Sequence, residues 1–243
     1  MPEQQQTSPA DFDPVFSKGM PIVGGHAVNL WAMLYSNRGD AELEAFFPFT
    51  SKDGDIFVKR RELAVTLANE IGWEFHANPE VRSPMLGKII LNRDGRRFEV
   101  DVLRSVTGLT DKDFETVNAI PFEDGKIYAL PPPDIMLKAK IANAATHDQA
   151  TRQDVRHIRI LLRCCAHYLA DAVENVRKGE LSERDAIDFF MSAWRVISSE
   201  RAKAQAVRFD LDLKSAIPPE KSLGDISGLS RLQAFYRHQI GES

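Results

Sequence analysis

Three consecutive prolines at positions 131–133 divide this 243-residue chain into two parts with different hydrophobic patterns. Proline lacks the backbone N–H that a sheet needs, so the run ends any strand that precedes it. Before it, short apolar segments typical of strands alternate with amphipathic helical segments; after it, the pattern is almost entirely helical. The sequence therefore predicts an α+β fold, in which a mixed β-sheet with flanking helices is followed by a helical C-terminal domain.

We expect a loose N-terminal arm at 1–19, an α/β domain at 20–133 and a helical domain at 134–243. The expected strands are 21–23, 55–58, 88–91, 98–103 and 126–130, with a tight turn at Arg93-Asp94-Gly95. The expected helices are 27–36, 61–71 ended by Gly72, 134–145, 152–176, 182–207 and 228–240, and the connection 37–50 has room for one helical turn. Residues 209–243 suggest packing or assembly rather than chemistry.

The composition is that of an ordinary globular protein, with 43% hydrophobic residues, 27% charged residues and a formal charge of −4. It excludes collagen-like, disordered and disulfide-scaffold classes. Charged residues interrupt every apolar run before the ~18–20 residues that a membrane span needs, and the Gln-rich start lacks the features of a secretory signal. We expect a cytoplasmic protein with no membrane contact. Adjacent Cys164 and Cys165 suit buried thiols rather than a disulfide framework or a metal clip.

A candidate phosphate site lies at Gly24-Gly25, between an expected strand and the start of a helix. Paired glycines let backbone N–H groups approach a phosphate, and the positive end of the helix dipole favours an anion. A plain turn is the alternative reading of the same residues.

A candidate metal site begins at Ser51-Lys52-Asp53-Gly54-Asp55. Residues two apart in an extended segment share one side, so Asp53 and Asp55 would place two carboxylates together, with Ser51 on the same side. Such oxygen ligands suit Mg²⁺ with bound phosphates. A polar surface turn is the alternative.

A third carboxylate, Asp101, lies between Val100 and Val102 in the expected strand 98–103. An unpaired charge there is costly unless it faces a site or a cation. An exposed edge strand with Glu99 on the same face explains it equally simply.

The order of these three features resembles the polymerase-β-type minimal nucleotidyltransferase superfamily. The segments Leu130-Pro131-Pro132-Pro133-Asp134-Ile135-Met136-Leu137-Lys138-Ala139-Lys140-Ile141 and Arg152-Gln153-Asp154-Val155-Arg156-His157-Ile158 are similar to those of the AbiEii group, which contains abortive-infection and toxin–antitoxin nucleotidyltransferases. The resemblance covers about residues 20–165. Two departures are the long gap between Gly25 and Asp53, and Gly54, where a hydrophobic residue is common.

The resemblance implies a role for each matching residue. Gly24 and Gly25 would hold a nucleoside triphosphate, Asp53 and Asp55 would bind two Mg²⁺ ions, and Asp101 would complete the metal site or act as the base. Further nucleotide-binding positions are Ser51, Lys140 and Asp154.

Lys138 competes with Lys140 for the role of the helix lysine. On a helix, Lys140 falls inside the apolar stripe of Leu137 and Ala144, where a lysine needs a partner, so Lys140 is preferred. A snorkelling side chain at the rim is the alternative.

Four arginines, Arg152, Arg156, Arg159 and Arg163, align on one face of the expected helix 152–176. Such a stripe could contact RNA or the triphosphate tail, whereas a solvated face paired with acidic neighbours is the alternative. Residues 152–208 contain 11 Lys and Arg against 8 Asp and Glu, so the overall negative charge does not exclude an RNA partner.

The resulting hypothesis is a Mg²⁺-dependent enzyme that transfers a nucleoside monophosphate from an NTP to a hydroxyl, with RNA such as tRNA as the acceptor that the toxin-type resemblance implies. A partner antitoxin follows from the same resemblance. The alternatives are a small-molecule, antibiotic-type nucleotidyltransferase and a degenerate NTP-binding or partner-binding module. An RNA acceptor predicts an open, arginine-lined cleft, and a small-molecule acceptor predicts a closed pocket with extra carboxylates.

Overall fold

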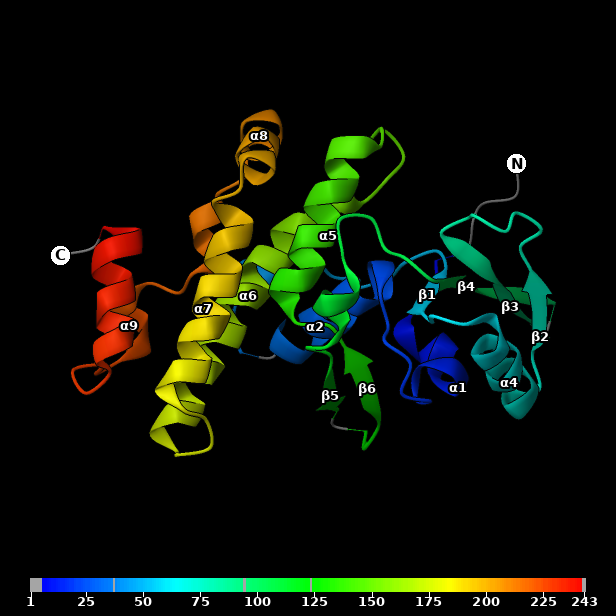
Figure 1. The fold of residues 1–243 in the computed structure, drawn as a ribbon, viewed down its shortest axis with the longest axis horizontal. Coiled ribbons are helices and arrows are strands. Elements are labelled where there is room, and N and C mark those ends of the chain that lie inside the picture. Colours follow the sequence, from blue (N-terminus) through cyan, green and yellow to red (C-terminus); the bar gives the residue numbers. More distant parts are fainter. Residues whose placement is uncertain (1–5, 37, 94, 123, 242–243) are drawn as a thin grey trace.

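A four-stranded mixed sheet forms one end of the molecule in the computed structural model, which describes residues 6–36, 38–93, 95–122 and 124–241 (Figure 1). Its strand order is β1-β4-β3-β2, with β1 parallel to β4 and the other pairs antiparallel. The strands are β1 (Gly54–Phe57), β2 (Glu74–Ala77), β3 (Met85–Arg93) and β4 (Arg96–Leu103). A second, two-stranded sheet pairs β5 (Asn118–Pro121) with β6 (Ile127–Leu130). The expected turn between β3 and β4 includes Asp94, which lies outside the described residues.

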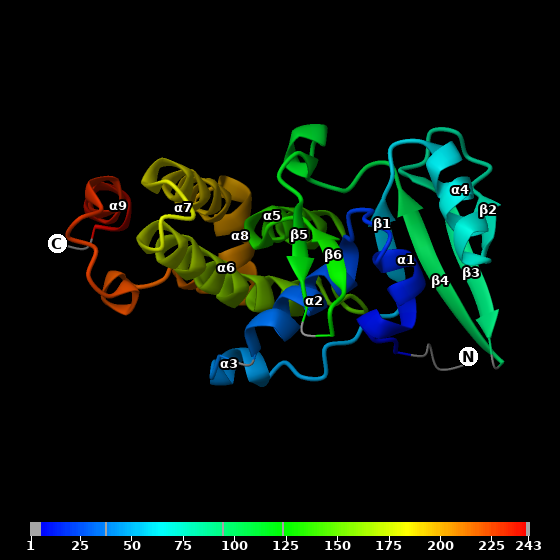
Figure 2. The same ribbon diagram turned by 90° about the horizontal axis from the view of Figure 1, so that it is seen from below.

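Short and long helices surround these sheets in the first half of the chain. They are η1 (Pro9–Phe12), α1 (Asp13–Phe16), α2 (Gly24–Ser36), α3 (Ala41–Glu44), α4 (Arg61–Ile71) and η2 (Asp111–Phe114). α1 and α4 cover one face of the four-stranded sheet (Figures 1 and 2). α4 ends at Gly72 as predicted, and α3 supplies the helical turn expected in 37–50.

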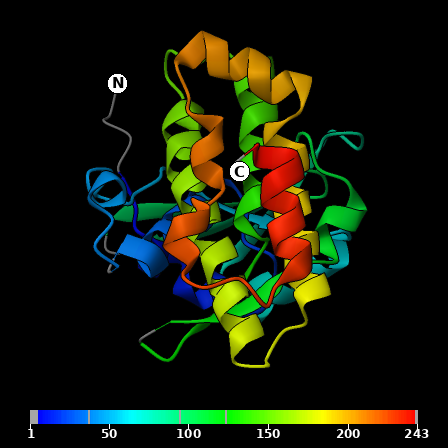
Figure 3. The same ribbon diagram turned by 90° about the vertical axis from the view of Figure 1, so that its left-hand side faces the viewer.

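The second half is helical, which confirms the predicted α+β class. Its elements are α5 (Pro133–Thr146), α6 (Asp154–Arg177), α7 (Glu183–Ile197), α8 (Glu200–Phe209), η3 (Leu213–Ala216), η4 (Glu220–Leu223), α9 (Ser230–Phe235) and the π-helical η5 (Tyr236–Ile240). The single helix expected over 182–207 is two helices, because the Ser199 side chain caps a new one by accepting the Ala202 N–H. The elements after α8, from η3 to η5, lie across the outer side of this half (Figure 3, orange to red). None of the described helices has both the length and the apolar character that crossing a bilayer requires.

The expected loose arm is wrong for residues 6–19, the part of it that the structure describes. Phe12, Val15 and Phe16 are fully buried under the sheet, on the side that α4 covers. Thr7 forms an antiparallel bridge with Ser51. The polar composition of the first ten residues concealed the apolar spacing that follows them.

α2 joins the two halves of the fold. It contacts β1 on one side and α5 and α6 on the other. The Trp31 indole N–H donates to the Pro131 carbonyl at 2.9 Å, in the proline run itself. Buried hydrophobic residues from both halves form one continuous cluster. The prolines therefore mark a change of secondary structure within a shared core.

Candidate active site

A cleft of about 500 Å³ lies where the two halves meet, a volume in the range of small-molecule sites. Its walls come from β1, β4, the starts of α2 and α6, and one side of α5. The structure brings nine of the predicted site residues into its lining: Gly24, Gly25, Ser51, Asp53, Asp55, Asp101, Lys140, Arg152 and Asp154. The predicted residues that do not line it are Arg156, Arg159 and Arg163.

Asp55 and Asp101 are neighbours across the parallel pair of strands, since their Cα atoms are register partners. Burial, with the charge of Asp101 as a second cause, raises the pKa of Asp55 to about 7. Burial also raises the pKa of Asp101 and of Asp53, and for Asp53 the charge of Asp101 adds to the effect. The cleft therefore concentrates acidic groups where water compensates their charge poorly.

Lys88 is the cation that faces these carboxylates in the sheet. It is the register partner of Asp101 on β3, and its Nζ lies 3.2 Å from Asp101 Oδ1 and 2.6 Å from Glu99 Oε2. β4 lies between β1 and β3, so the reading of Asp101 as part of an exposed edge strand is wrong. The ion pair with Lys88 explains how the charge is tolerated.

The donor chemistry of the cleft suits a hard divalent cation, because carboxylate oxygens are the ligands that Mg²⁺ prefers. Burial raises the pKa values of Asp53, Asp55 and Asp101 although Lys88 lies nearby, so the charge of these groups is only partly compensated. In the described part of the chain, however, no three His, Cys, Asp or Glu side chains are grouped closely enough to hold a metal ion. Binding an ion here would require the carboxylates to move closer together, and Lys88 would compete with the ion at Asp101.

The two glycines allow the start of α2 to approach the carboxylate loop closely. Gly24 has φ +66°, and a Cβ at this position would lie 1.9 Å from Asp55 Oδ2. A Cβ at Gly25 would lie 2.3 Å from Ser51 Oγ. Any larger residue would displace these side chains, which is the physical reason for glycine at both positions.

The Ser51 turn is held by the N-terminal segment. Backbone hydrogen bonds join Thr7 and Ser51 in both directions, at 2.8 and 3.0 Å, and the Thr7 hydroxyl also donates to the Ser51 carbonyl at 2.8 Å. His26 Nε2 lies 3.1 Å from the same hydroxyl, and its ring packs against Phe12 and Phe16. Burial lowers the pKa of His26 to about 4. His26 thus supports the turn from inside the core.

Lys140 and Asp154 form a buried ion pair at the wall of the cleft. Lys140 Nζ lies 3.1 Å from Asp154 Oδ1, and Arg152 Nε donates to Asp154 Oδ2 at 2.6 Å. Burial alone would raise the pKa of Asp154, but the charges of Lys140 and Arg152 outweigh it and hold this pKa below its usual range. Lys138 points elsewhere, to Asp113 at 2.9 Å. The geometry therefore favours Lys140 over Lys138 as the lysine of the cleft.

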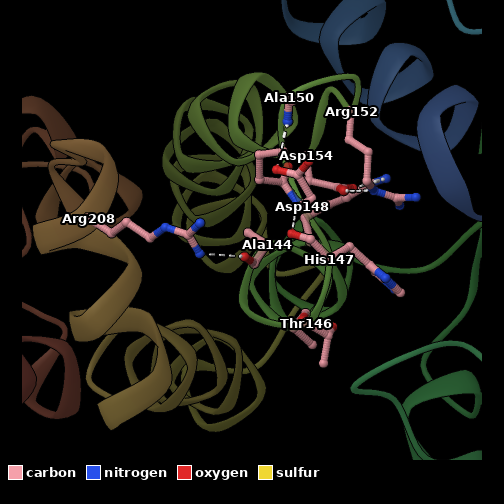
Figure 4. A network of polar contacts seen from close by, with 11 residues as sticks. Ala144, Thr146, His147, Asp148, Ala150, Arg152, Asp154 and Arg208 are labelled. Carbon is pink, nitrogen blue, oxygen red and sulfur yellow. Dashed lines mark hydrogen bonds and ion pairs between the residues drawn. The ribbon is translucent and has the colours of Figure 1, made fainter.

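The four arginines of the expected stripe differ in their surroundings. Arg152 lies in the loop between α5 and α6, beside Asp154 (Figure 4). Arg156 donates to the carbonyls of Phe46 and Pro48, and Arg159 donates to that of Phe209. Arg163 forms an ion pair with Asp40 at 2.9 Å. These three side chains hold neighbouring segments in place, so only Arg152 of the stripe faces the cleft.

Sequence reasoning missed several polar residues in the lining. They come from the segment after β4, from α5, from the loop between α5 and α6 and from the start of α6: Ser105, Thr107, Asn143, His147, Thr151, Gln153 and His157. Their residue types are common in loops and on helix surfaces, so only the path of the chain reveals that they converge.

No protein-family model matches the chain, and no curated protein matches it. Among solved structures, it is similar to the crystal structure of the Megavirus polyadenylate synthase, with a TM-score of 0.41 and 12% sequence identity. The match covers 68% of this chain and 35% of that one, so the chain spans about a third of that longer protein.

Proposed function

We propose that this chain is a nucleotidyltransferase, which moves a nucleoside monophosphate from an NTP to a hydroxyl acceptor. One observation carries the proposal. Two glycines at the start of α2, three aspartates on β1, β4 and the turn before β1, and a buried lysine on α5 line the same cleft. An anion-binding helix start beside carboxylates that could take part in holding a cation is the combination that phosphoryl transfer from an NTP uses.

In this mechanism, the acceptor oxygen attacks the α-phosphorus, and the bond from that phosphorus to the bridging β-phosphate oxygen breaks. Asp101 accepts the proton of the attacking hydroxyl or contributes to the cation site. The N–H groups at Gly24-Gly25 and the Lys140 ammonium hold the oxygens of the departing pyrophosphate. Asp53 and Asp55, with Asp101, would hold Mg²⁺, which when bound supplies positive charge to the triphosphate.

The acceptor class is a separate part of the proposal. RNA such as tRNA, a toxin-type role, a partner antitoxin and a cytoplasmic location rest on the sequence resemblance to the AbiEii group. Arg156, Arg159 and Arg163 are bonded to other segments of the fold, so they do not form the arginine-lined path that an RNA acceptor predicts. This observation favours a small-molecule hydroxyl as the second candidate.

The direct test is incubation with Mg²⁺ and each labelled NTP, with total tRNA or with a panel of small hydroxyl compounds including aminoglycosides. The wild type is compared with Asp55→Asn and Asp101→Asn, and with Asp111→Asn as a control at an exposed ion pair away from the cleft. We expect label transfer by the wild type and the control only. Equal transfer by all four proteins would falsify the assignment of the carboxylates. Nucleotide binding without transfer would indicate a degenerate module.

A further inference from the structure

His157, in the first turn of α6, is a buried side chain of the cleft without a hydrogen-bond partner. Its residue is 4% exposed, and neither Nδ1 nor Nε2 has a partner among the described residues. Buried polar groups are nearly always hydrogen-bonded, and exceptions at native sites call for a specific explanation. A bound ligand that supplies the missing partner is one such explanation.

The position of His157 indicates which part of a ligand it would contact. A Cβ at Gly25 would lie 3.3 Å from His157 Cε1 and 2.3 Å from Ser51 Oγ. The ring therefore lies at the end of the cleft where α2 begins. The N-terminus of α6, a helix of 24 residues, lies at the same wall and favours an anion.

We propose that His157 is a ligand-binding residue that donates a ring N–H to an oxygen of the triphosphate chain of the bound NTP. This assignment rests on the proposed function of the cleft and adds a contact to it. It also supplies a partner to a buried ring whose nitrogens have none among the described residues.

The chemistry of the ring suits this contact. Burial lowers the pKa of His157 well below its ordinary value, and the charges of Lys140 and Arg156 act in the same direction. The ring is therefore neutral, with one nitrogen as donor and the other as acceptor. A neutral donor binds phosphate without a second buried charge beside Lys140. His26, by contrast, has a partner in Thr7 for Nε2, leaves only Nδ1 without one among the described residues, and does not line the cleft.

The test measures binding of each NTP, of inorganic tripolyphosphate and of each nucleoside monophosphate by calorimetry in Mg²⁺. The proteins are the wild type, His157→Leu, His157→Gln, which keeps an N–H donor, and His76→Leu, a control at an exposed histidine paired with Glu74. We expect His157→Leu to weaken NTP and tripolyphosphate binding about tenfold or more. Monophosphate binding should change little, and His157→Gln should recover part of the loss.

Thermal unfolding without ligand shows whether each variant is folded. His157→Leu removes two unpaired buried nitrogens, so its Tm should equal or exceed that of the wild type. Unchanged tripolyphosphate affinity in His157→Leu, with NTP binding by the wild type intact, would overturn the role of His157 and leave the proposed function standing. A wild type that binds no NTP would overturn both. An equal loss for monophosphates and triphosphates would place the contact elsewhere on the nucleotide and also overturn the assignment.

Discussion

Asp55 and Asp101 occupy register-paired positions on two adjacent parallel strands, with their acidic groups in the same cleft. Like charges at facing positions of a sheet are destabilising. The only cation at the same register is Lys88, which Asp101 shares with Glu99 in the described part of the sheet. Keeping these carboxylates together therefore lowers the stability of the folded protein.

Removing the charge of Asp55 should stabilise the protein and abolish transfer. The pKa of Asp55 is raised to about 7, so its ionised form costs stability above that pH, and the cost disappears as the pH falls toward the ordinary carboxyl pKa. In EDTA, Asp55→Asn should raise the free energy of unfolding at pH 8 by up to about 4 kcal/mol, and by little at pH 4. Denaturant unfolding at both pH values checks this. Destabilisation at pH 8 would contradict it.

Replacing Lys88 should have opposite effects on stability and on cation affinity. Lys88→Met leaves Asp101 and Glu99 with less compensating charge, so the metal-free protein should unfold about 1–2 kcal/mol more easily. If Mg²⁺ takes the place of the ammonium at Asp101, the same variant should bind Mg²⁺ more tightly by calorimetry. Lys59→Met, at an exposed pair with Asp111, is the control and should change neither quantity. Weaker Mg²⁺ binding in Lys88→Met would argue against exchange at Asp101.

The close approach at Gly24 can be separated from its backbone conformation. Gly24 and Gly179 have similar φ values, +66° and +74°, but only Gly24 has side-chain atoms where a Cβ would stand. Gly179→Ala should cost about 1–2 kcal/mol of stability, the strain of the left-handed conformation, and keep full activity. Gly24→Ala should cost more than this and lose activity, because the new methyl group displaces Asp55. Equal effects of the two substitutions on unfolding and on transfer would contradict the close approach.

His26 should make stability depend on pH on the acidic side of neutrality. Its pKa is about 4 in the folded protein and about 6.5 when unfolded, so between these values the unfolded chain binds more protons. Stability should fall by about 3 kcal/mol from this residue as the pH drops from 7 to 4. In His26→Gln, which can still bond to Thr7, that part of the pH dependence should be missing from denaturant curves. Parallel curves for the two proteins would show that His26 is not the cause.

The predictable parts of the fold depend on local patterns. Hydrophobic periodicity placed α4, α5 and α6 nearly correctly, and the spacing of Asp53 and Asp55 in an assumed extended segment pointed to two carboxylates that both line the cleft. Strand β2, by contrast, is short and largely exposed, so it has little apolar pattern to detect. The helices before residue 17 were missed because their burial depends on contacts with distant segments.

The predictable parts of the site are the residues with unusual chemistry. Glycine pairs, clustered aspartates and a lysine in an apolar stripe stand out in a sequence. Lys88 and His157 do not, since a lysine in a strand and a histidine in a helix are ordinary. Their importance comes from pairing across the sheet and from burial beside Gly25, which only the folded chain defines.

The walls of the cleft are supplied by segments from residue 24 to residue 157 of the chain. During synthesis, a chain that has emerged only to the proline run carries all three aspartates but lacks the helices with Lys140, Asp154 and His157. The emerging first half therefore exposes an acidic sheet face that has Lys88 beside it but lacks the wall that α5 and α6 supply. The lining of this site is complete only after the ribosome has delivered the first turn of α6.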